Sequence, residues 1–203
     1  MIKSRHHSLT IWFFDLYFRW KMAFHFRGIE VHANEQADPQ RPVLLLQNHF
    51  SWWDGYWSLW LSKRFFQKRF HVMMLEEQLH KRMFINRCGA FSVRKNSREL
   101  LEALTYAAGL LHAHQNLVCL YPQGEIQSQQ VKTIAFGKGA SWILKHAGEP
   151  VQVWFCVTLT DYFSSSKPLI RFCLKHYEGE RTTQSMELAY NSFRDECINK
   201  QHD

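Results

Sequence analysis

Residues 48–54 have the sequence NHFSWWD, and this stretch indicates the fold of the chain more clearly than any other. It follows residues 43–46, an apolar run whose length and composition are typical of a buried strand. It precedes residues 55–66, an aromatic-rich segment that predicts a helix. His49 and Asp54 are therefore expected where a strand ends and a helix begins. That edge of an α/β sheet is where catalytic groups usually gather.

A histidine followed five residues later by an aspartate is suited to general-base catalysis. The Asp54 carboxylate can accept a hydrogen bond from one ring nitrogen of His49, which fixes the tautomer and leaves the other nitrogen free to accept a proton. The pair has no nucleophile of its own, so the nucleophile would be a hydroxyl of the substrate. Ser51 lies two residues from the histidine and is more plausible as the N-cap of the following helix.

Taken alone, the His-Asp spacing is a weak signal. Such a pair is more often a chance occurrence in a helix N-terminal turn, because short motifs have many false positives. Here the pattern Asn-His-x-Ser-x-x-Asp resembles the signature block of the glycerolipid acyltransferases, the 1-acylglycerol-3-phosphate acyltransferase-like family. Further segments within roughly residues 30–160 follow in the order of that family. The resemblance favours a catalytic role for His49 and Asp54.

A second segment, residues 88–94 (CGAFSVR), is apolar and ends in a cation. The family has a Gly-x-x-x-x-Arg block here, which Gly89 and Arg94 match. The resemblance implies that Arg94 binds an anionic group of the acceptor, and an arginine at a strand end can hold a phosphate or carboxylate through two hydrogen bonds. Without the resemblance, Arg94 would be interpreted as a solvated surface arginine.

A third segment, residues 121–128 (YPQGEIQS), resembles the family block Phe-Pro-Glu-Gly-Thr-Arg-Ser. The proline and Gly124 match, but the glutamate of the block is Gln123 here and its arginine is Ile126. These positions are associated with acceptor binding in the family, so the resemblance implies acceptor contacts from Gln123 and Gly124, with Glu125 as a further candidate. Losing the arginine removes a phosphate ligand, which predicts poor activity on lysophosphatidic acid or glycerol phosphate.

The resemblance implies an O-acyltransferase of lipid biosynthesis and phospholipid metabolism. It would move a fatty acyl chain from an acyl thioester, acyl-CoA or acyl-ACP, to the hydroxyl of a lipid acceptor, with a glycolipid or aminolipid preferred. The thioester would be a co-substrate, and no cofactor or metal ion is expected. The protein would be peripheral, on the cytoplasmic face of the inner or plasma membrane, with the anionic membrane surface as a partner.

Two other function classes compete with this hypothesis. A non-catalytic lipid-binding protein that retains the fold is supported by the altered third block, but it has no need of the intact His-Asp pair. A nucleic-acid-binding protein would fit the net charge of +7 and the pI of about 9.2, yet no zinc finger or RNP-like segment is present. We therefore expect no nucleic-acid partner. The five cysteines are widely spaced, which argues against a disulfide framework and a zinc site.

The length of 203 residues suits one compact domain. We expect an α/β fold with a single domain, a mixed and mostly parallel sheet flanked by helices, and an N-terminal amphipathic helix. Residues 1–27 would form that helix at the membrane interface, and residues 28–203 the acyltransferase domain. Expected strands cover 28–33, 43–46, 70–75, 117–121, 151–159 and 169–177, and expected helices cover 55–66, 76–87, 96–115, 140–147 and 186–199.

The N-terminal segment 8–26 is strongly apolar but contains charged residues, and its uncharged run is too short to span a bilayer. It predicts a helix in the membrane interface, anchored by Trp12, Trp20 and several phenylalanines. A helix packed on the core would show the same residues, so both interpretations stay open. Residues 1–7 are basic and expected to be frayed.

Two further patterns concern helices around the predicted site. The aromatic residues that follow His49 either line the path of the acyl chain or serve ordinary helix packing. These are Trp52, Trp53, Tyr56 and Trp57. The helix at 96–115 is predicted to bury an apolar stripe formed by Leu100, Leu101, Leu104, Ala107, Ala108 and Leu111.

Overall fold

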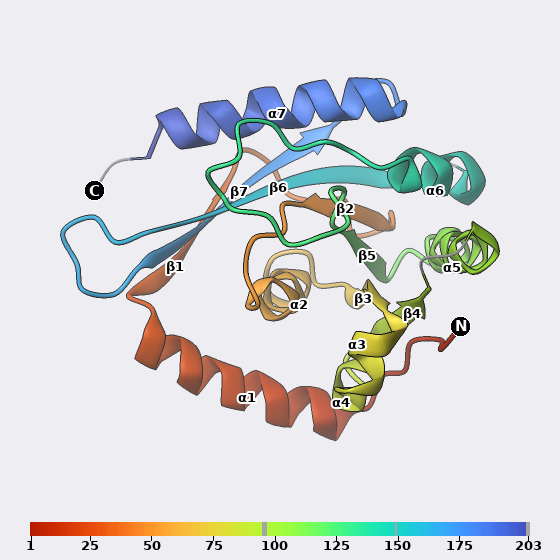
Figure 1. Cartoon of the computed structure of the whole chain (residues 1–203), viewed down its shortest axis with the longest axis horizontal. Coiled ribbons are helices and arrows are strands. Elements are labelled where there is room, and N and C mark those ends of the chain that lie inside the picture. The colour runs from red at the N-terminus through yellow and green to blue at the C-terminus, as the bar shows by residue number, and fades with distance from the viewer. Residues whose placement is uncertain (95–96, 149, 202–203) are drawn as a thin grey trace.

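Seven strands form one sheet in the order β1-β7-β6-β2-β5-β3-β4 in the computed structural model of the chain (Figure 1). The structure describes residues 1–94, 97–148 and 150–201. The strands are β1 (Gly28–Ala33), β2 (Val43–Gln47), β3 (Arg69–Leu75), β4 (Ala90–Val93), β5 (Asn116–Leu120), β6 (Gln152–Asp161) and β7 (Leu169–Tyr177). The helices are α1 (Ser8–His25), α2 (Asp54–Arg64), α3 (Glu76–His80), α4 (Met83–Asn86), α5 (Ser97–Leu110), α6 (Gly139–Ala147) and α7 (Thr183–Asn199).

The sheet is mixed and mostly parallel, as the sequence predicted. Strands β6 and β7 pair antiparallel, and every other neighbouring pair is parallel. Parallel strands end at the same edge of a sheet, and the segments that follow them meet there. Because β2 and β5 are direct neighbours, the segments after Gln47 and Leu120 lie side by side. The expected single α/β domain is confirmed.

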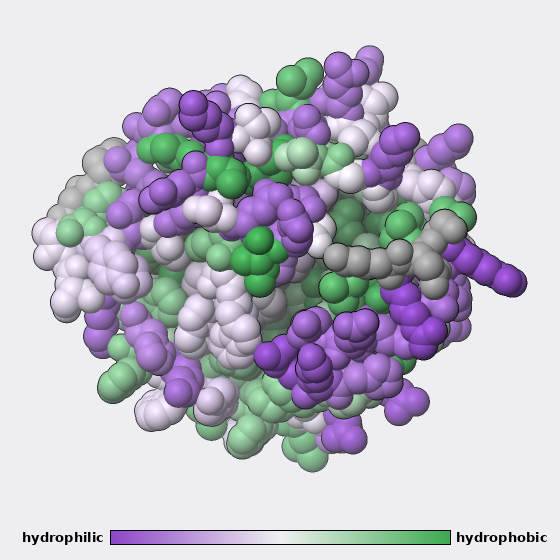
Figure 2. Space-filling view, in the orientation of Figure 1, coloured by the Kyte–Doolittle hydropathy of each residue, from purple (hydrophilic) through white to green (hydrophobic). Residues whose placement is uncertain are grey.

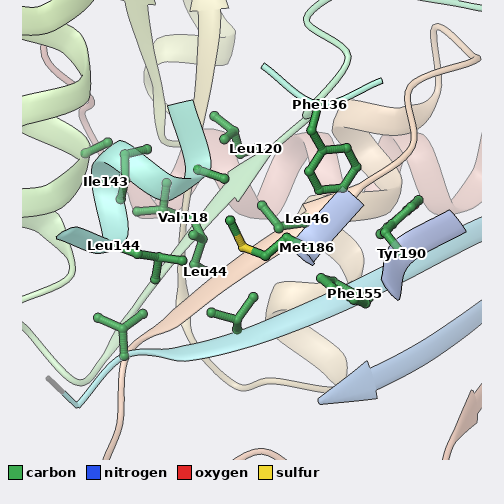
Figure 3. Close-up of a cluster of buried hydrophobic side chains, with 14 of the residues drawn as sticks. Leu44, Leu46, Val118, Leu120, Phe136, Ile143, Leu144, Phe155, Met186 and Tyr190 are labelled. Atoms are coloured by element: carbon green, nitrogen blue, oxygen red, sulfur yellow. The ribbon is translucent and has the colours of Figure 1, made fainter. Parts of the chain in front are cut away.

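The central strand β2 is buried on both faces, which explains its continuous apolar sequence. Its side chains alternate between the two faces of the sheet. Leu44 and Leu46 belong to one core, with α5, α6 and α7, whereas Val43 and Leu45 belong to the other, with α1 and α2. Figure 3 shows Leu44 and Leu46 facing Met186 of α7 in the first core.

The second core places α2 between the sheet and α1 (Figure 1). Phe18 of α1 stacks on Tyr56 of α2 with ring centroids 4.6 Å apart. The indole N–H of Trp57 donates to the sulfur of Met22 at 3.4 Å. Tyr56 and Trp57 are buried in this contact, while Trp52 is 61% exposed. Helix packing therefore accounts for Tyr56 and Trp57, and α1 is braced against the helix that begins at Asp54.

The expectation that residues 1–7 are frayed is wrong. The main chain of Ile2 pairs with Ser92 at the free edge of β4, through bonds of 2.6 and 2.9 Å. The Asn86 side chain donates to the carbonyl of Lys3 at 2.8 Å, and the imidazole Nε2 of His6 lies 2.8 Å from the carbonyl oxygen of Phe70. Edge strands offer unpaired main-chain groups, and charge composition alone does not reveal such partners.

The single helix expected over residues 76–87 is instead two short helices, α3 and α4. The helical conformation breaks at Arg82, whose φ and ψ are −143° and 56°. After the break, the Asn86 side chain donates to the carbonyl of Ala90 at 2.9 Å. The bend is therefore fixed by contacts with the edge strand, which local charge pattern does not encode.

The helix expected over 96–115 ends earlier, and four residues of its predicted stripe are buried while two are not. Residue 96 lies outside the described residues. Helix α5 ends at Leu110, and Leu100 and Leu101 are 40% and 49% exposed rather than buried. The buried side chains are Ala103, Leu104, Ala107, Ala108 and Leu111. This face is rich in small residues, and α5 packs against α6 on that side of the sheet. Apolar spacing predicted the helix and most of its buried face, but not that Leu100 and Leu101 would be exposed.

Candidate active site

His49 and Asp54 lie together at the carboxyl end of β2. His49 belongs to the connection after the strand, and Asp54 is the first residue of α2. The imidazole Nδ1 and the carboxylate Oδ2 are 2.6 Å apart, which is a short hydrogen bond. The two side chains that stood out in the sequence are therefore in direct contact.

The Asp54 carboxylate is fully buried and holds the connection as well as the imidazole. Its Oδ2 also accepts the main-chain N–H groups of Phe50 and Ser51, each at 2.8 Å. Burial raises the pKa of the Asp54 carboxyl, and the hydrogen bonds from His49 and from the two N–H groups oppose that rise. Three donors converge on one oxygen, so the carboxylate has one well-defined position.

The His49 imidazole is held by Asp54 and remains accessible. Its side chain is 22% exposed. With Nδ1 donating to Asp54, the tautomer leaves Nε2 as the nitrogen that accepts a proton. One face of the ring stacks on Tyr121 with centroids 4.2 Å apart and planes inclined by 16°. This combination of a fixed ring and an accessible Nε2 is what a general base requires.

Ser51 is not the N-cap of α2, contrary to the sequence interpretation. The N-cap position is Trp53. The Ser51 hydroxyl instead accepts the N–H of Trp53 at 3.2 Å. Asp54 holds the preceding main-chain N–H groups, and this leaves the hydroxyl only a local role in the turn.

The third segment lies against His49, because β5 and β2 are neighbours. The Gln123 amide oxygen accepts the main-chain N–H of His49 at 3.0 Å, and the Gln123 amide nitrogen donates to the carbonyl of His49 at 3.1 Å. Gly124 has φ of +71°, the left-handed conformation that favours glycine, and closes a turn by donating to the carbonyl of Tyr121 at 3.0 Å. Glu125 is exposed and accepts a hydrogen bond from the Gln127 side chain at 3.1 Å.

Arg94 lies at the end of β4, three strands away from β2 in the sheet order. Its guanidinium contacts Glu76 at 2.6 and 2.9 Å and Glu99 at 3.1 Å. Hydrogen bonds from Ser92 and Arg94 lower the pKa of the Glu76 carboxyl, which keeps it ionised. The positive charge of Arg94 is therefore balanced by two carboxylates within the protein.

Ile126 occupies the position at which the resembling family block has arginine. Its side chain is 58% exposed in the segment that carries Gln123. An exposed isoleucine in this segment offers apolar contact and no charge for a phosphate. The recess in the face drawn in Figure 2 has hydrophobic atoms in its depth and lies close to the ends of β2 and β5 in Figure 1.

The site also depends on residues to which sequence reasoning gave no role. Asn48 donates its side-chain amide to the carbonyl of Thr158 at 2.9 Å and accepts the N–H of Thr158 at 2.8 Å. Because Thr158 belongs to β6, this pair ties the end of β2 to the neighbouring strand. A polar residue that directly follows a buried strand was the available signal. The contacts of Gln123 and Tyr121 with His49 had no comparable local signal.

No group of three or more His, Cys, Asp or Glu side chains in the described part of the chain has the arrangement of a metal site. The five cysteines are free and buried. An open hollow of about 600 Å³ lies at the end of β6, lined by residues including Gln129, Thr160 and Arg194. Arg194 donates to the carbonyls of Gln129 and Val131 at 2.7 Å, so it serves the packing of this segment.

The profile of the acyltransferase family matches residues 28–156 of the chain, a range that contains all three segments. The chain therefore belongs to the acyltransferase family and is an acyltransferase, as the sequence resemblance indicated. A comparison with curated proteins finds no match.

The fold is similar to that seen in a solved structure of an acyltransferase. This is the crystal structure of PlsC, the 1-acyl-sn-glycerophosphate (LPA) acyltransferase from Thermotoga maritima. The TM-score is 0.57 with 15% sequence identity, over 97% of this chain and 81% of that chain. At this identity the likeness concerns the fold alone.

Proposed function

We propose that this acyltransferase transfers a fatty acyl chain from an acyl thioester, acyl-CoA or acyl-ACP, to the hydroxyl of a lipid acceptor in lipid biosynthesis. The observation that carries the proposal is the 2.6 Å hydrogen bond between His49 Nδ1 and the buried carboxylate of Asp54. The bond leaves an accessible base nitrogen at the sheet edge where such groups act.

The mechanism needs no covalent acyl-enzyme. His49 Nε2 removes the proton from the acceptor hydroxyl while the oxygen attacks the thioester carbonyl. The carbon–sulfur bond then breaks, the ester forms, and the imidazolium returns the proton to the leaving thiolate. Asp54 stabilises the imidazolium between these steps, as the carboxylate does in other histidine dyads. A positioned base of this kind supplies about 10²–10⁴-fold in rate, and alignment of the two substrates supplies more.

The acceptor we propose has no phosphate monoester. The guanidinium of Arg94 is already paired with Glu76 and Glu99, so binding a phosphate there requires breaking those pairs. The second cation of the family pattern is replaced by Ile126. A hydroxylated lipid with a neutral or amino headgroup, such as a glycolipid or aminolipid, fits these two features better than lysophosphatidic acid.

Helix α1 would hold the enzyme at the membrane surface. Its outward side carries an unbroken apolar stripe whose members are between 41% and 71% exposed: Leu9, Trp12, Phe13, Leu16, Tyr17, Trp20 and Phe24. The spacing of three and four residues places them on one face, opposite Phe14, Phe18 and Met22, which pack on the core. Among the described residues no helix is long and apolar enough to cross a membrane.

A peripheral position follows from this stripe. Aromatic residues are favoured at the membrane interface, and the net charge of +7 is attracted to anionic headgroups. Phe18, on the inner side of α1, also lies 6.1 Å from Trp53, ring centroid to centroid, within the connection that holds His49. Docking of α1 would therefore present the site to lipid acceptors in the bilayer. The cytoplasmic face of the inner or plasma membrane, where thioester donors are present, suits this arrangement.

The catalytic proposal is tested by His49→Ala with an acyl thioester and a panel of hydroxylated lipids. We expect transfer to fall by about 10²–10⁴-fold, with circular dichroism and thermal melting unchanged because the ring is partly exposed. Transfer that continues at the wild-type rate would remove His49 from the mechanism. The same panel compares lysophosphatidic acid with glycolipids, and efficient formation of phosphatidic acid would contradict the acceptor class.

The membrane proposal is tested by flotation with vesicles that contain anionic lipids. Trp12→Ser combined with Trp20→Ser is expected to abolish flotation, since both indoles lie on the outward stripe. Leu188→Ser is the matched control, because Leu188 is 64% exposed on α7, away from that stripe. If the double variant floats as well as the wild-type protein does, α1 is not the membrane contact.

A further inference from the structure

We infer that Gln123 is a positioning residue whose side-chain amide fixes the main chain of His49 for catalysis. The inference rests on the proposed function, because the placement of His49 has a kinetic meaning only if His49 is the base. It differs from the sequence-based prediction that Gln123 contacts the acceptor.

The Gln123 amide contacts the main chain of His49 at two points, and its nitrogen also donates to the Oε1 of Gln127 at 3.4 Å. Its oxygen accepts the N–H of His49 at 3.0 Å and its nitrogen donates to the carbonyl of His49 at 3.1 Å. The chemistry fixes the orientation of the amide, since a main-chain N–H must meet the oxygen and a carbonyl must meet the NH₂ group. The contact joins residues 74 positions apart, and so it ties the end of β2 to the turn that follows β5.

The remaining contacts fix the other parts of His49. The N–H of Gln127 donates to the His49 carbonyl at 2.9 Å. Asp54 holds Nδ1, and the ring of Tyr121 covers one face of the imidazole. The Tyr121 hydroxyl lies 2.9 Å from the buried hydroxyl of Ser58, which limits movement of that ring as well. The main chain, the ring plane and Nδ1 of His49 are therefore each held by a contact, and Nε2 is left to meet the substrate.

We call the two hydrogen bonds between the Gln123 amide and the main chain of His49 the clamp. The clamp requires an amide at position 123. A glutamate has the same shape, but its ionised carboxylate has no donor and would face the carbonyl of His49 at about hydrogen-bond distance. One hydrogen bond would become a repulsion between two acceptors. Glutamate is the residue that the resembling family block carries at this position. The change Gln123→Glu therefore restores the family pattern and, in this chain, is expected to displace the base.

Displacement of the base affects the chemical step more than substrate binding. A catalytic group misplaced by about 1 Å can cost about 10²-fold in rate. If Gln123 only positions His49, kcat falls and KM for both substrates stays nearly constant. If Gln123 instead ligates the acceptor, KM for the acceptor rises and kcat changes less.

The experiment compares Gln123→Glu and Gln123→Ala with wild-type enzyme in steady-state acyl transfer. We expect Gln123→Glu to lower kcat about 10–10²-fold, with KM values within about threefold and the circular dichroism spectrum of the folded wild type. Gln123→Ala loses the hydrogen bonds of the amide without introducing the repulsion, so its kcat is expected to lie between those of Gln123→Glu and the wild type. Gln130→Glu is the matched control, because it makes the same change at an exposed position of the same segment and should have wild-type kcat.

The pH profile supplies a readout that a purely structural role would not move. When protonated, the carboxyl group introduced by Gln123→Glu regains a donor and can restore the two-point contact. The kcat of this variant relative to wild type is therefore expected to rise as the pH falls. A pH-independent ratio, an unchanged kcat, or a change confined to KM would each overturn the inference.

A second measurement separates this inference from the proposed function. If the wild-type enzyme transfers no acyl group, the proposed function fails, but the clamp is still tested by NMR of protein with ¹⁵N-labelled histidine. The Nδ1–H signal of His49 is assigned by its loss in His49→Gln. We expect this proton to exchange with solvent at least about tenfold faster in Gln123→Glu than in Gln130→Glu, and equal exchange in the two variants would overturn the inference.

Discussion

The end of β2 and the end of β4 lie at the same edge of the sheet, and the chain treats them differently. At the end of β2, Asp54 is fully buried, His49 is partly covered, and the Asp54 carboxylate binds both the imidazole and the main chain of the connection. At the end of β4, Arg94 is 57% exposed and is neutralised by Glu76 and Glu99. The first region has the features of a group held for chemistry, and the second has those of a structural ion-pair network.

The difference teaches that reaction and recognition can change separately within one fold. Removing a proton from a hydroxyl needs one geometry, whatever the acceptor carries. Holding a phosphate needs unpaired cations near the site, and here one family cation is engaged and another is Ile126. In the proposed mechanism the chain keeps the reacting pair and differs from the family block at the surface proposed to bind the acceptor, which agrees with function residing in sites rather than in folds.

Among changes to these two regions, Asp54→Asn is expected to have the largest effect. The asparagine oxygen can take the place of Oδ2, which accepts three donors, and its NH₂ the place of Oδ1, which has no partner. The tautomer of His49 survives, but the charge that stabilises the imidazolium is lost. We expect kcat to fall about 10²-fold, measured in single-turnover transfer. A loss smaller than about threefold would mean that Asp54 only orients the ring.

The second prediction concerns the pH dependence of stability, and it arises in the region of β3 and β4 where residues 1–7 are anchored. Burial, with a smaller contribution from His6, lowers the pKa of His71 from 6.5 to about 4. Between these values the unfolded chain binds more protons than the folded chain, so stability is retained above pH 6.5 and is lost as the pH falls toward 4. The loss is roughly 3 kcal/mol, read from urea unfolding at several pH values. His71→Gln is expected to flatten that dependence, and an unchanged slope in this variant would refute the assignment.

A third change sharpens the contrast by restoring charge at the acceptor surface. Ile126→Arg adds a cation beside the catalytic edge, where the native side chain is exposed. We expect kcat/KM for lysophosphatidic acid to rise about tenfold relative to a neutral glycolipid, which corresponds to one modest charge-assisted contact of about 1.4 kcal/mol. Competition between the two acceptors in one reaction measures the ratio. An unchanged ratio would show that position 126 does not face the acceptor.

The smallest effect is expected for a change at Arg94, although the resemblance implies that this residue binds the acceptor. Because its guanidinium is engaged by Glu76 and Glu99, Arg94→Gln should change KM for the preferred acceptor by less than about threefold. Steady-state kinetics across acceptor concentrations checks this. A KM that rises tenfold or more would show that the arginine leaves its carboxylates to bind the acceptor.

The sequence predicted much of the fold because burial leaves a local pattern. The apolar run at residues 43–46 is part of a central parallel strand covered on both faces, and such strands carry no alternation. The expected elements also lie in the order of the observed ones. Errors occurred where partners are distant in sequence. The N-terminal residues pair with Ser92 at the β4 edge, and the face of α5 is chosen by its packing on α6 and the sheet.

The candidate site shows the same difference between contacts that are local in sequence and contacts that are not. The His49–Asp54 contact spans five residues and forms within one strand-to-helix connection, so the local motif, together with its resemblance to the family block, was sufficient to predict it. By contrast, Gln123 contacts His49, 74 residues away, and Arg94 contacts Glu76, 18 residues away. Hydrogen bonds of that kind depend on which strands become neighbours, and no local pattern specifies them.

The sequence by itself therefore determined the α/β class, the acyltransferase family and the identity of the pair His49 and Asp54. The fold class depends on apolar periodicity, and the family and the pair depend on the resemblance of short local motifs to the family blocks. The chain carries both kinds of pattern whether or not it is folded. Only the tertiary structure decided that Gln123 holds the main chain of His49 and that Arg94 is neutralised. The pairing of β2 with β5, and of β4 with β3, brings those groups together, and such long-range contacts exist only once the sheet has formed.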